Sequence, residues 1–203
     1  MRKKLFALAI VVICAAIAAM GTIAYFTTSE TTTNVITTGK VDIALGTDVT
    51  NVKDIPVVMP GVTLQQPVTV TNQPGAAEAY IRVKVEVELT KAGETTAVSP
   101  EELAGLVTLT SASGDWVGKG GWWYYTKNNG VLAATPADAA DAERSSTTPL
   151  QLNIRFSGSA MGNEYQNAAG KIRVYAQAVQ VKNNPGETAL SAMGWPEESQ
   201  AQN

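Results

Sequence analysis

The stretch of sequence that decides the fold runs from Tyr80 to Thr90 and reads YIRVKVEVELT. Every second residue from Ile81 to Leu89 is apolar, and the residues between them are Arg, Lys, Glu and Glu. Alternation with a period of two is typical of a strand that buries one face and exposes the other. The stretch therefore predicts a long central strand whose odd-numbered side chains lie in the core.

Similar alternation recurs on both sides of this stretch. Four further segments are expected to be strands: Val41–Leu45, Val68–Thr71, Leu150–Phe156 and Lys171–Val181. Turns rich in Gly, Pro and Asn separate the strands, and little helix lies between them. This order predicts an all-β fold, an antiparallel jelly-roll-like β-sandwich with one or two short helices. The last segment is apolar on parts of both faces and is expected to be a central strand as well.

Two segments are expected to be helical and one to be a loop. Ser99-Pro100-Glu101-Glu102 is a capping box with Pro at the first helical position, which predicts a short helix to Leu106. Another turn or two is expected between Glu187 and Met193. The segment from Thr135 to Thr148 is rich in Ala, Asp, Ser and Thr and is expected to be a mobile loop.

The first residues have the pattern of a secretory signal. Basic Met1–Lys4 is followed by apolar Leu5–Met20, and small Thr22 and Ala24 stand three and one residues before a polar start at Tyr25. Signal peptidases require small residues at those two positions, so cleavage is expected between Ala24 and Tyr25. The alternative is an uncleaved anchor, because an apolar segment of about 20 residues is long enough to span a bilayer. Only this uncleaved segment would contact a membrane.

The exported chain would differ in composition from its precursor. Three of the 15 Lys and Arg leave with the signal, so 12 stand against 18 Asp and Glu, a formal charge of −6. An acidic balance argues against nucleic acid or anionic lipid as a partner. The expected division is a signal (1–24), a leader (25–39), one sandwich domain (40–195) and a tail (196–203), with the mature protein secreted to the matrix or cell surface.

Several blocks resemble the TasA/camelysin family of exported Gram-positive proteins. The blocks are Ala24–Thr31, Gly39–Ile43, Met59–Gly61, Val68–Asn72, Ala79–Val85, Gly121–Tyr125, Ser146–Leu150 and Ala176–Gln180. Their order and spacing match the family along nearly the whole chain. The resemblance implies a jelly-roll fold, processing by a SipW-type signal peptidase and, as in some relatives, fibres of the biofilm matrix.

The same resemblance implies assembly of the chain with copies of itself. In such fibres the mature N-terminal segment enters the sheet of the next subunit as a donor strand, which implies a head-to-tail homopolymer here, with an anchoring minor subunit as a further candidate partner. The leader suits an extended strand because it is rich in Thr and Val, lacks Pro and carries one charge before Gly39. The expected donor-strand residues are Tyr25, Phe26, Thr31, Thr33, Val35 and Ile36. The alternative is a leader that pairs within its own domain or stays disordered.

Some relatives are described as metalloproteases, but the residues here do not favour an enzyme. The chain has no histidine, and its single cysteine, Cys14, lies in the signal. A histidine-based zinc site, a Ser-His-Asp triad and a cysteine nucleophile are therefore all excluded from the mature chain. Asp138, Asp141 and Glu143 are conceivable as a weak calcium site, although their spacing specifies no ligand set. We predict a non-enzyme with no cofactor, no catalytic residue and no metal site.

A group of aromatic residues allows a second kind of function. Trp116, Trp122, Trp123 and Tyr125 lie near glycines and are suited to stacking on sugar rings, as in a monomeric glycan-binding module. The alternative is a β-hairpin whose aromatic side chains fill the core on one side and cover the sheet on the other. A protease is the third and least favoured possibility.

Overall fold

The computed structural model describes residues 27–29, 40–45, 52–55 and 58–196. The strands are β1 Thr27–Ser29, β2 Ile43–Leu45, β3 Val52–Ile55, β4 Thr63–Val68, β5 Val70–Asn72, β6 Ala79–Thr90, β7 Val107–Ser111, β8 Trp116–Lys119, β9 Trp122–Tyr125, β10 Val131–Leu132, β11 Leu150–Phe156 and β12 Ala169–Gln180. The helical elements are α2 Pro100–Leu106 and the 3₁₀ turns η1 Lys127–Gly130, η2 Asp141–Glu143 and η3 Asn163–Tyr165.

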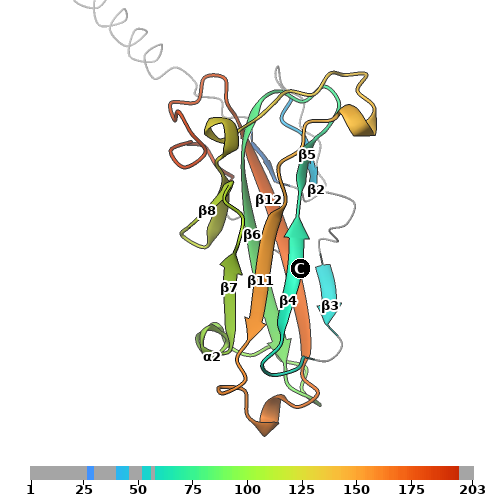
Figure 1. Ribbon diagram of the computed structural model, residues 1–203, viewed down its shortest axis with the longest axis vertical. Coiled ribbons are helices and arrows are strands. Elements are labelled where there is room, and N and C mark those ends of the chain that lie inside the picture. Colours follow the sequence, from blue (N-terminus) through green and yellow to red (C-terminus); the bar gives the residue numbers. More distant parts are fainter. Residues whose placement is uncertain (1–26, 30–39, 46–51, 56–57, 197–203) are drawn as a thin grey trace, which may run out of the picture.

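The strands form two layers that face each other (Figure 1). The larger sheet has seven strands in the order β1-β12-β6-β9-β8, with β10 also on β6 and β3 also on β12. The smaller sheet has the order β4-β11-β7, and β2 pairs with β5, which follows β4 along the chain. All of these pairs are antiparallel. The predicted all-β antiparallel sandwich is therefore confirmed.

The core lies between the sheets and follows the alternation of the sequence. On β6 the apolar side chains from Ile81 to Leu89 are buried, and Arg82, Lys84, Glu86 and Glu88 are only partly buried on the opposite face. Strand β11 alternates in the same way, and its Leu150, Leu152, Ile154 and Phe156 join the same cluster. The prediction for Tyr80–Thr90 is thus confirmed residue by residue.

The predicted first helix is also confirmed. Ser99 is the N-cap of α2, and its hydroxyl accepts a hydrogen bond from the Glu102 amide at 3.3 Å. Near the C-terminus the structure has turns in place of the expected helix. The Ala192 amide donates to the Thr188 carbonyl at 2.8 Å, which is a single turn of helical hydrogen bonding.

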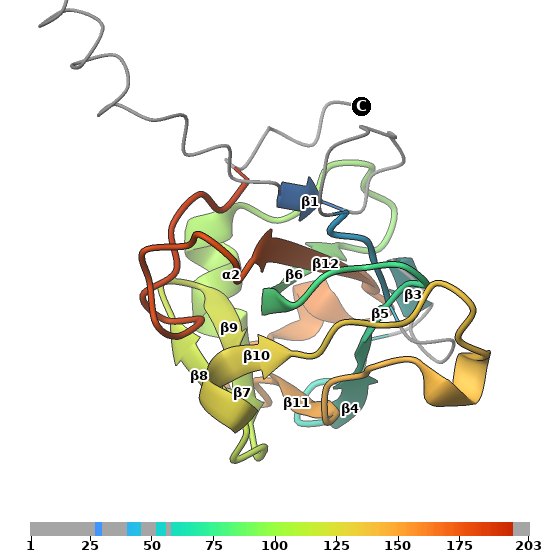
Figure 2. The ribbon, with the colours of Figure 1, turned by 90° about the horizontal axis from the view of Figure 1, so that it is seen from above.

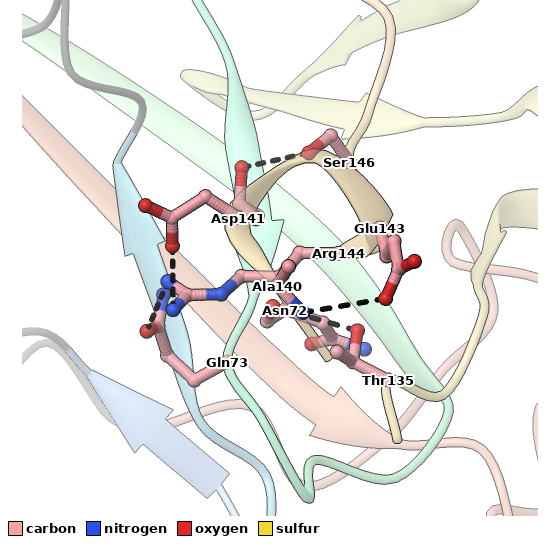
Figure 3. Close-up of polar contacts among 9 residues, drawn as sticks. Asn72, Gln73, Thr135, Ala140, Asp141, Glu143, Arg144 and Ser146 are labelled. Carbon is pink, nitrogen blue, oxygen red and sulfur yellow. Dashed lines mark hydrogen bonds and ion pairs between the residues drawn. The ribbon is translucent and has the colours of Figure 1, made fainter. Parts of the chain in front are cut away.

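The segment expected to be a mobile loop is attached to β5 by its first residue, Thr135, and by Ser145–Thr147 near its end. The Thr147 hydroxyl accepts a bond from the Val70 amide at 3.0 Å, and the hydroxyls of Thr71 and Ser146 lie 2.8 Å apart. Arg144 contacts Asp141 at 2.6 Å and Gln73 at 3.3 Å (Figure 3). The composition typical of a loop was recognised, but its attachment was missed because the partners are about 75 residues away in sequence.

Buried Asn72 explains why this loop follows β5. The side-chain amide of Asn72 donates to the carbonyls of Ala77 and Ala133, at 3.0 and 2.8 Å. Because a buried polar group is costly without hydrogen bonds, these contacts fix where the loop begins.

In the part of the chain that the structure describes, no helix is long and apolar enough to cross a membrane. The apolar segment before Tyr25 lies outside that part.

Candidate functional site

The two edges of β12 are paired in different ways. One edge is bonded to β6 over all twelve residues, from Ala169 opposite Thr90 to Gln180 opposite Ala79. The other edge is bonded to β3 at Gly170–Arg173 and to β1 at Gln177–Val179. Among the described residues, no strand pairs with Val174–Ala176 on that side. Within the described ranges, the second edge of β12 is therefore paired with two short strands, β1 and β3.

Strand β1 is the described part of the N-terminal leader. Its three residues pair with β12 in the register Thr27–Val179, Thr28–Ala178 and Ser29–Gln177. Both β1 and β3 are antiparallel to β12 and so run in the same direction along one edge. Figure 2 shows β1 lying beside β12 at the margin of the sheet. The three described residues of the leader thus pair with its own domain.

Next to this edge, the outer face of the large sheet holds an arginine between two tryptophans. The guanidinium carbon of Arg82 lies 4.0 Å from the ring centre of Trp122 and 4.6 Å from that of Trp195. The same guanidinium donates two hydrogen bonds to the side-chain oxygen Oε1 of Gln177, at 2.8 and 2.6 Å. Gln177 is only 5% exposed and lies in the β12 register position opposite Ser29. Arg82 thus connects the C-terminal segment to the part of β12 that β1 covers.

Residues 181–196, here called the C-terminal clasp, cover this end of the outer face. Tyr80, Val179, Ala189 and Ala192 form a second apolar cluster, with Trp195 packed against it. Tyr80 donates a hydrogen bond to the Gly186 carbonyl at 3.1 Å, and burial raises the pKa of its hydroxyl. Trp195 thus holds the end of the described chain against this cluster.

The clasp also requires a glycine at the turn before β10. Gly130 has a φ of +84°, and a Cβ at this position would lie 2.8 Å from the Cβ of Ala189. Both the backbone conformation and the close approach exclude larger residues.

The predicted aromatic ligand patch forms a hairpin that is mostly buried. Trp116, Trp122 and Tyr125 are 4%, 6% and 3% exposed, and Trp123 packs at the margin of the main core. Gly120 and Gly121 form the two-residue turn with φ of +60° and +80°, as hairpins with tight turns require. The Trp116 indole nitrogen donates to the Thr148 carbonyl at 2.9 Å, and its ring lies 5.2 Å from that of Tyr125. This arrangement favours the packing interpretation over sugar stacking.

A second polar cluster joins α2 to the far end of the sheet. Lys91 Nζ lies 2.9 Å from a carboxylate oxygen of Glu102, which also accepts a hydrogen bond from the Tyr165 hydroxyl. The bond from Tyr165, and then that from Lys91, lower the pKa of Glu102 below its usual range. Burial, and then the Glu102 carboxylate, raise the pKa of Tyr165. Lys91 follows β6 and Tyr165 precedes β12, so the cluster holds the ends of both strands together.

The described acidic residues do not fit a catalytic metal. Among them and the other metal-ligating types in the described ranges, no group of three or more is arranged to hold an ion. Of the conceivable calcium ligands, Asp141 is paired with Arg144, and Glu143 accepts a hydrogen bond from the Ala140 amide at 3.4 Å (Figure 3). Asp138 is exposed. We derive no reaction step through a metal at these residues.

The predicted signal and donor-strand residues lie outside the described residues. They are Thr22, Ala24, Tyr25, Phe26, Thr31, Thr33, Val35 and Ile36. Of the leader, only Thr27–Ser29 is described. The cleavage site and the donor strand therefore stay predictions.

Comparison with known proteins gives one match. The model of a family described as camelysin metallo-endopeptidase matches residues 1–109. This range includes the apolar N-terminus, the leader, strands β1 to β6, helix α2 and the first part of β7. The resembling blocks from Gly121 onward lie beyond the match. No curated protein matches the chain, and no solved structure matches it either.

Proposed function

The chain belongs to the camelysin metallo-endopeptidase family, whose model matches more than half of its length, and from this premise we propose that it is a secreted structural subunit of extracellular fibres. In this proposal its leader leaves β12 of its own domain and pairs with β12 of the next subunit. The observation that carries the proposal is the pairing of β1, a three-residue strand, with the edge of β12 that β6 does not occupy, where β3 is the other partner among the described residues. Export by a signal at 1–24 is part of the same proposal.

The energetic basis is the weakness of the β1 pairing. A backbone hydrogen bond contributes about 1 kcal/mol net, whereas ordering one residue costs about 1–2 kcal/mol. A strand of three residues therefore gains little by staying on its own domain. A leader from another subunit makes the same main-chain bonds, so exchange between subunits costs little. Each subunit would give one leader and accept one, and such head-to-tail contacts produce an open filament when they do not close.

The register of β1 indicates how far an incoming strand can extend. Position 27 lies opposite Val179, so an incoming strand in this register would place positions 30–32 opposite Ala176–Val174. The next β12 residue, Arg173, is already paired with Val52 of β3. An acceptor edge from Val174 to Val179 thus accommodates positions 27–32 without displacing β3. Other copies of the same leader are expected to be its occupants.

The family description names a metallo-endopeptidase, and this chain is proposed to lack that activity. The reason lies in the residues available: the sequence has no histidine, and the carboxylates of Glu88, Glu102 and Asp141 are engaged with Arg173, Lys91 and Arg144. Cleavage of casein by the pure protein, abolished by a chelator, would overturn this part of the proposal.

Electron microscopy tests the assembly. Three proteins are compared by negative stain: Tyr25–Asn203, the same protein with a bulky N-terminal extension, and a chain that starts at Lys40. Filaments are expected only from the first, since the other two lack a leader that can insert. Normal filaments from the chain that starts at Lys40 would refute strand exchange.

Cysteine pairing tests the acceptor edge itself. Thr28 and Ala178 are directly opposite in the β1–β12 register, a geometry in which a disulfide fits. The mature chain contains no other cysteine. One protein carrying Thr28→Cys is mixed with another carrying Ala178→Cys, and a disulfide-linked dimer is expected on non-reducing gels of the filaments. Lys119→Cys on β8 replaces Ala178→Cys in the control. Filaments with no more cross-linking than the control would show that β12 is not the acceptor.

A further inference from the structure

The outer face of the smaller sheet is a polar surface without a carboxylate. Strands alternate, so one set of side chains on β4, β11 and β7 points away from the core. These residues are Thr63, Gln65, Pro67, Gln151, Asn153, Arg155, Thr108 and Thr110, and all except half-buried Asn153 are exposed. They supply hydroxyls, amides and a single positive charge. The absence of Asp and Glu from this face is unusual in a chain that has more Asp and Glu than Lys and Arg.

One end of this face is hollowed around Arg155. The hollow has a volume of about 600 Å³ and is lined by Gly61, Thr108, Thr110, Arg155, Ser157, Gly158 and Ser159. Thr108 is directly opposite Arg155 on β7, and Thr63 is opposite it on β4. Gly61 and Gly158 form the floor where two loops meet, and a Cβ on Gly158 would lie 3.3 Å from the Cα of Gly61. The hollow is therefore built from the smallest side chains of both loops.

Arg155 differs from the other arginines of the described ranges. Arg82 is bonded to Gln177, Arg144 is paired with Asp141, and Arg173 is paired with Glu88. The structure gives Arg155 no ion pair and no hydrogen bond with a described residue, although it lies on the central strand of its sheet. A guanidinium presents a planar set of donors that matches a carboxylate or phosphate with two hydrogen bonds. Hydroxyl groups around it are available to bond the rest of a ligand.

We propose that this face binds an extended polyhydroxyl polymer that carries oxyanions, with Arg155 holding the anionic group. The polymer is an acidic polysaccharide and the oxyanion is a uronate carboxylate, which a guanidinium binds with two hydrogen bonds, because the hydroxyl and amide side chains around one charged group suit sugar rings that carry many hydroxyls. Thr108, Thr110 and Ser159 bond hydroxyls of the polymer in the hollow. An open, flat sheet face suits a chain that lies across several strands and leaves the rest of the polymer in solvent. This site is separate from the β12 edge and does not depend on fibre assembly.

The test measures polymer binding by Tyr25–Asn203 with isothermal titration calorimetry at low salt. The probes are polygalacturonate, polyglycerol phosphate and neutral dextran of similar length. Binding of polygalacturonate and none of dextran is expected, whereas binding of polyglycerol phosphate alone would overturn the assignment of a uronate ligand. The two anionic probes distinguish a carboxylate ligand from a phosphodiester ligand.

Four variants show whether the hollow is the site. Arg155→Gln is expected to weaken binding about tenfold or more, and Arg155→Lys by a smaller factor, because lysine keeps the charge without the paired donors. Thr108→Val with Thr110→Val keeps strand propensity and is expected to weaken binding several-fold. Lys119→Gln removes one positive charge from exposed β8 and is the matched control, expected to stay within about twofold. Melting temperatures show that each variant is folded.

Four outcomes would overturn the proposal. The first is unchanged affinity in Arg155→Gln, and the second is an equal loss in Lys119→Gln, which indicates general charge attraction. The third is binding of dextran as tightly as the anionic polymers. The fourth is no measurable binding of polygalacturonate, whether or not polyglycerol phosphate binds.

Discussion

The two edges of β12 show what different partners do to the same strand. Along one edge, β6 matches β12 residue for residue over twelve positions, and the side chains of both strands enter the main core. Along the other edge, β3 and β1 contribute four and three pairs. The first pairing is inseparable from the folded state. The second adds strands to a sheet that is already complete without them.

This difference shows how one strand can serve stability and assembly together. An edge strand exposes unpaired main-chain groups, and these attract strands from other chains. Here that edge is the side of β12 on which β1 and β3 are the partners among the described residues, and β6 holds the same strand firmly on its opposite side. A change of partner on one side therefore need not disturb the fold on the other. Four predictions test this separation, from the largest expected effect to the smallest.

The largest loss of stability is expected from a substitution on β6, the strand that pairs with β12 along its full length. Ile81 lies on β6 opposite Ala178 and is completely buried. Ile81→Ala removes three methyl or methylene groups from the core and is expected to lower the free energy of unfolding by about 2–5 kcal/mol, measured by urea denaturation. Ile81→Val should cost about 1 kcal/mol. A loss below 1 kcal/mol for Ile81→Ala would contradict the central role of this pairing.

A smaller loss of stability is expected from replacing Arg82, which lies on β6 and bonds the part of β12 that β1 covers. Arg82→Ala removes both contacts with tryptophan rings and leaves the buried side-chain oxygen of Gln177 without its donor. An unsatisfied buried polar group costs about 1–3 kcal/mol, so a loss in that range is expected in urea denaturation. Tryptophan fluorescence should also change, because Trp122 and Trp195 lose their shared partner. Lys171→Ala on β12 is the control; a loss as large as that of Arg82→Ala would assign the effect to charge.

The third prediction concerns the loss of stability at low pH that depends on Glu102, in the cluster at the far end of the β6–β12 pairing. The pKa of Glu102 is lowered in the folded protein, so its contribution to stability is present above the usual glutamate pKa and is lost as the pH falls through and below that value. Glu102→Gln should therefore make the melting temperature less dependent on pH in the acid range. Glu101→Gln, one residue earlier in α2, is the matched control. Identical acid profiles for both variants would rule out a special role for Glu102.

The smallest change in stability is expected from the poorly paired side. A chain that starts at Lys40 lacks β1 and should lose less than about 1 kcal/mol, since three ordered residues cost nearly as much as their bonds contribute. Hydrogen exchange should nevertheless increase at those β12 amides that face away from β6. Loss of stability comparable to that of Ile81→Ala would show that β1 is an integral strand.

Much of the fold could be predicted because its information is local. Alternation alone indicated β6, β11 and β12, and the sequence around Ser99 indicated α2 with its cap. The blocks around Gly39 and Ala79 led to the family that the match over residues 1–109 shows. The strand and helix predictions depend on near neighbours in sequence, and the family resemblance depends on the order of such short blocks along the chain.

The rest depends on contacts between distant parts of the chain. Arg82, Gln177 and Trp195 are individually ordinary residues, and only the fold brings them together. The attachment of residues 133–148 to β5 was missed for the same reason. The aromatic hairpin was recognised with both of its interpretations, and burial of its rings was needed to favour packing. No local pattern identified which strands pair with the second edge of β12, because β1 and β3 are more than a hundred residues away from their partners in sequence.

The direction of β1 has a mechanical consequence for a filament built in the proposed way. Strand β12 runs along the long axis of the molecule (Figure 1), and β1 lies antiparallel to it. Backbone hydrogen bonds between antiparallel strands are perpendicular to the strands. Tension along the filament would therefore pull the inserted strand parallel to β12 and strain all of its hydrogen bonds at once, in shear. A joint in this geometry resists stretching far better than peeling, so such a fibre would be strong along its length and would come apart when strands are lifted from one end.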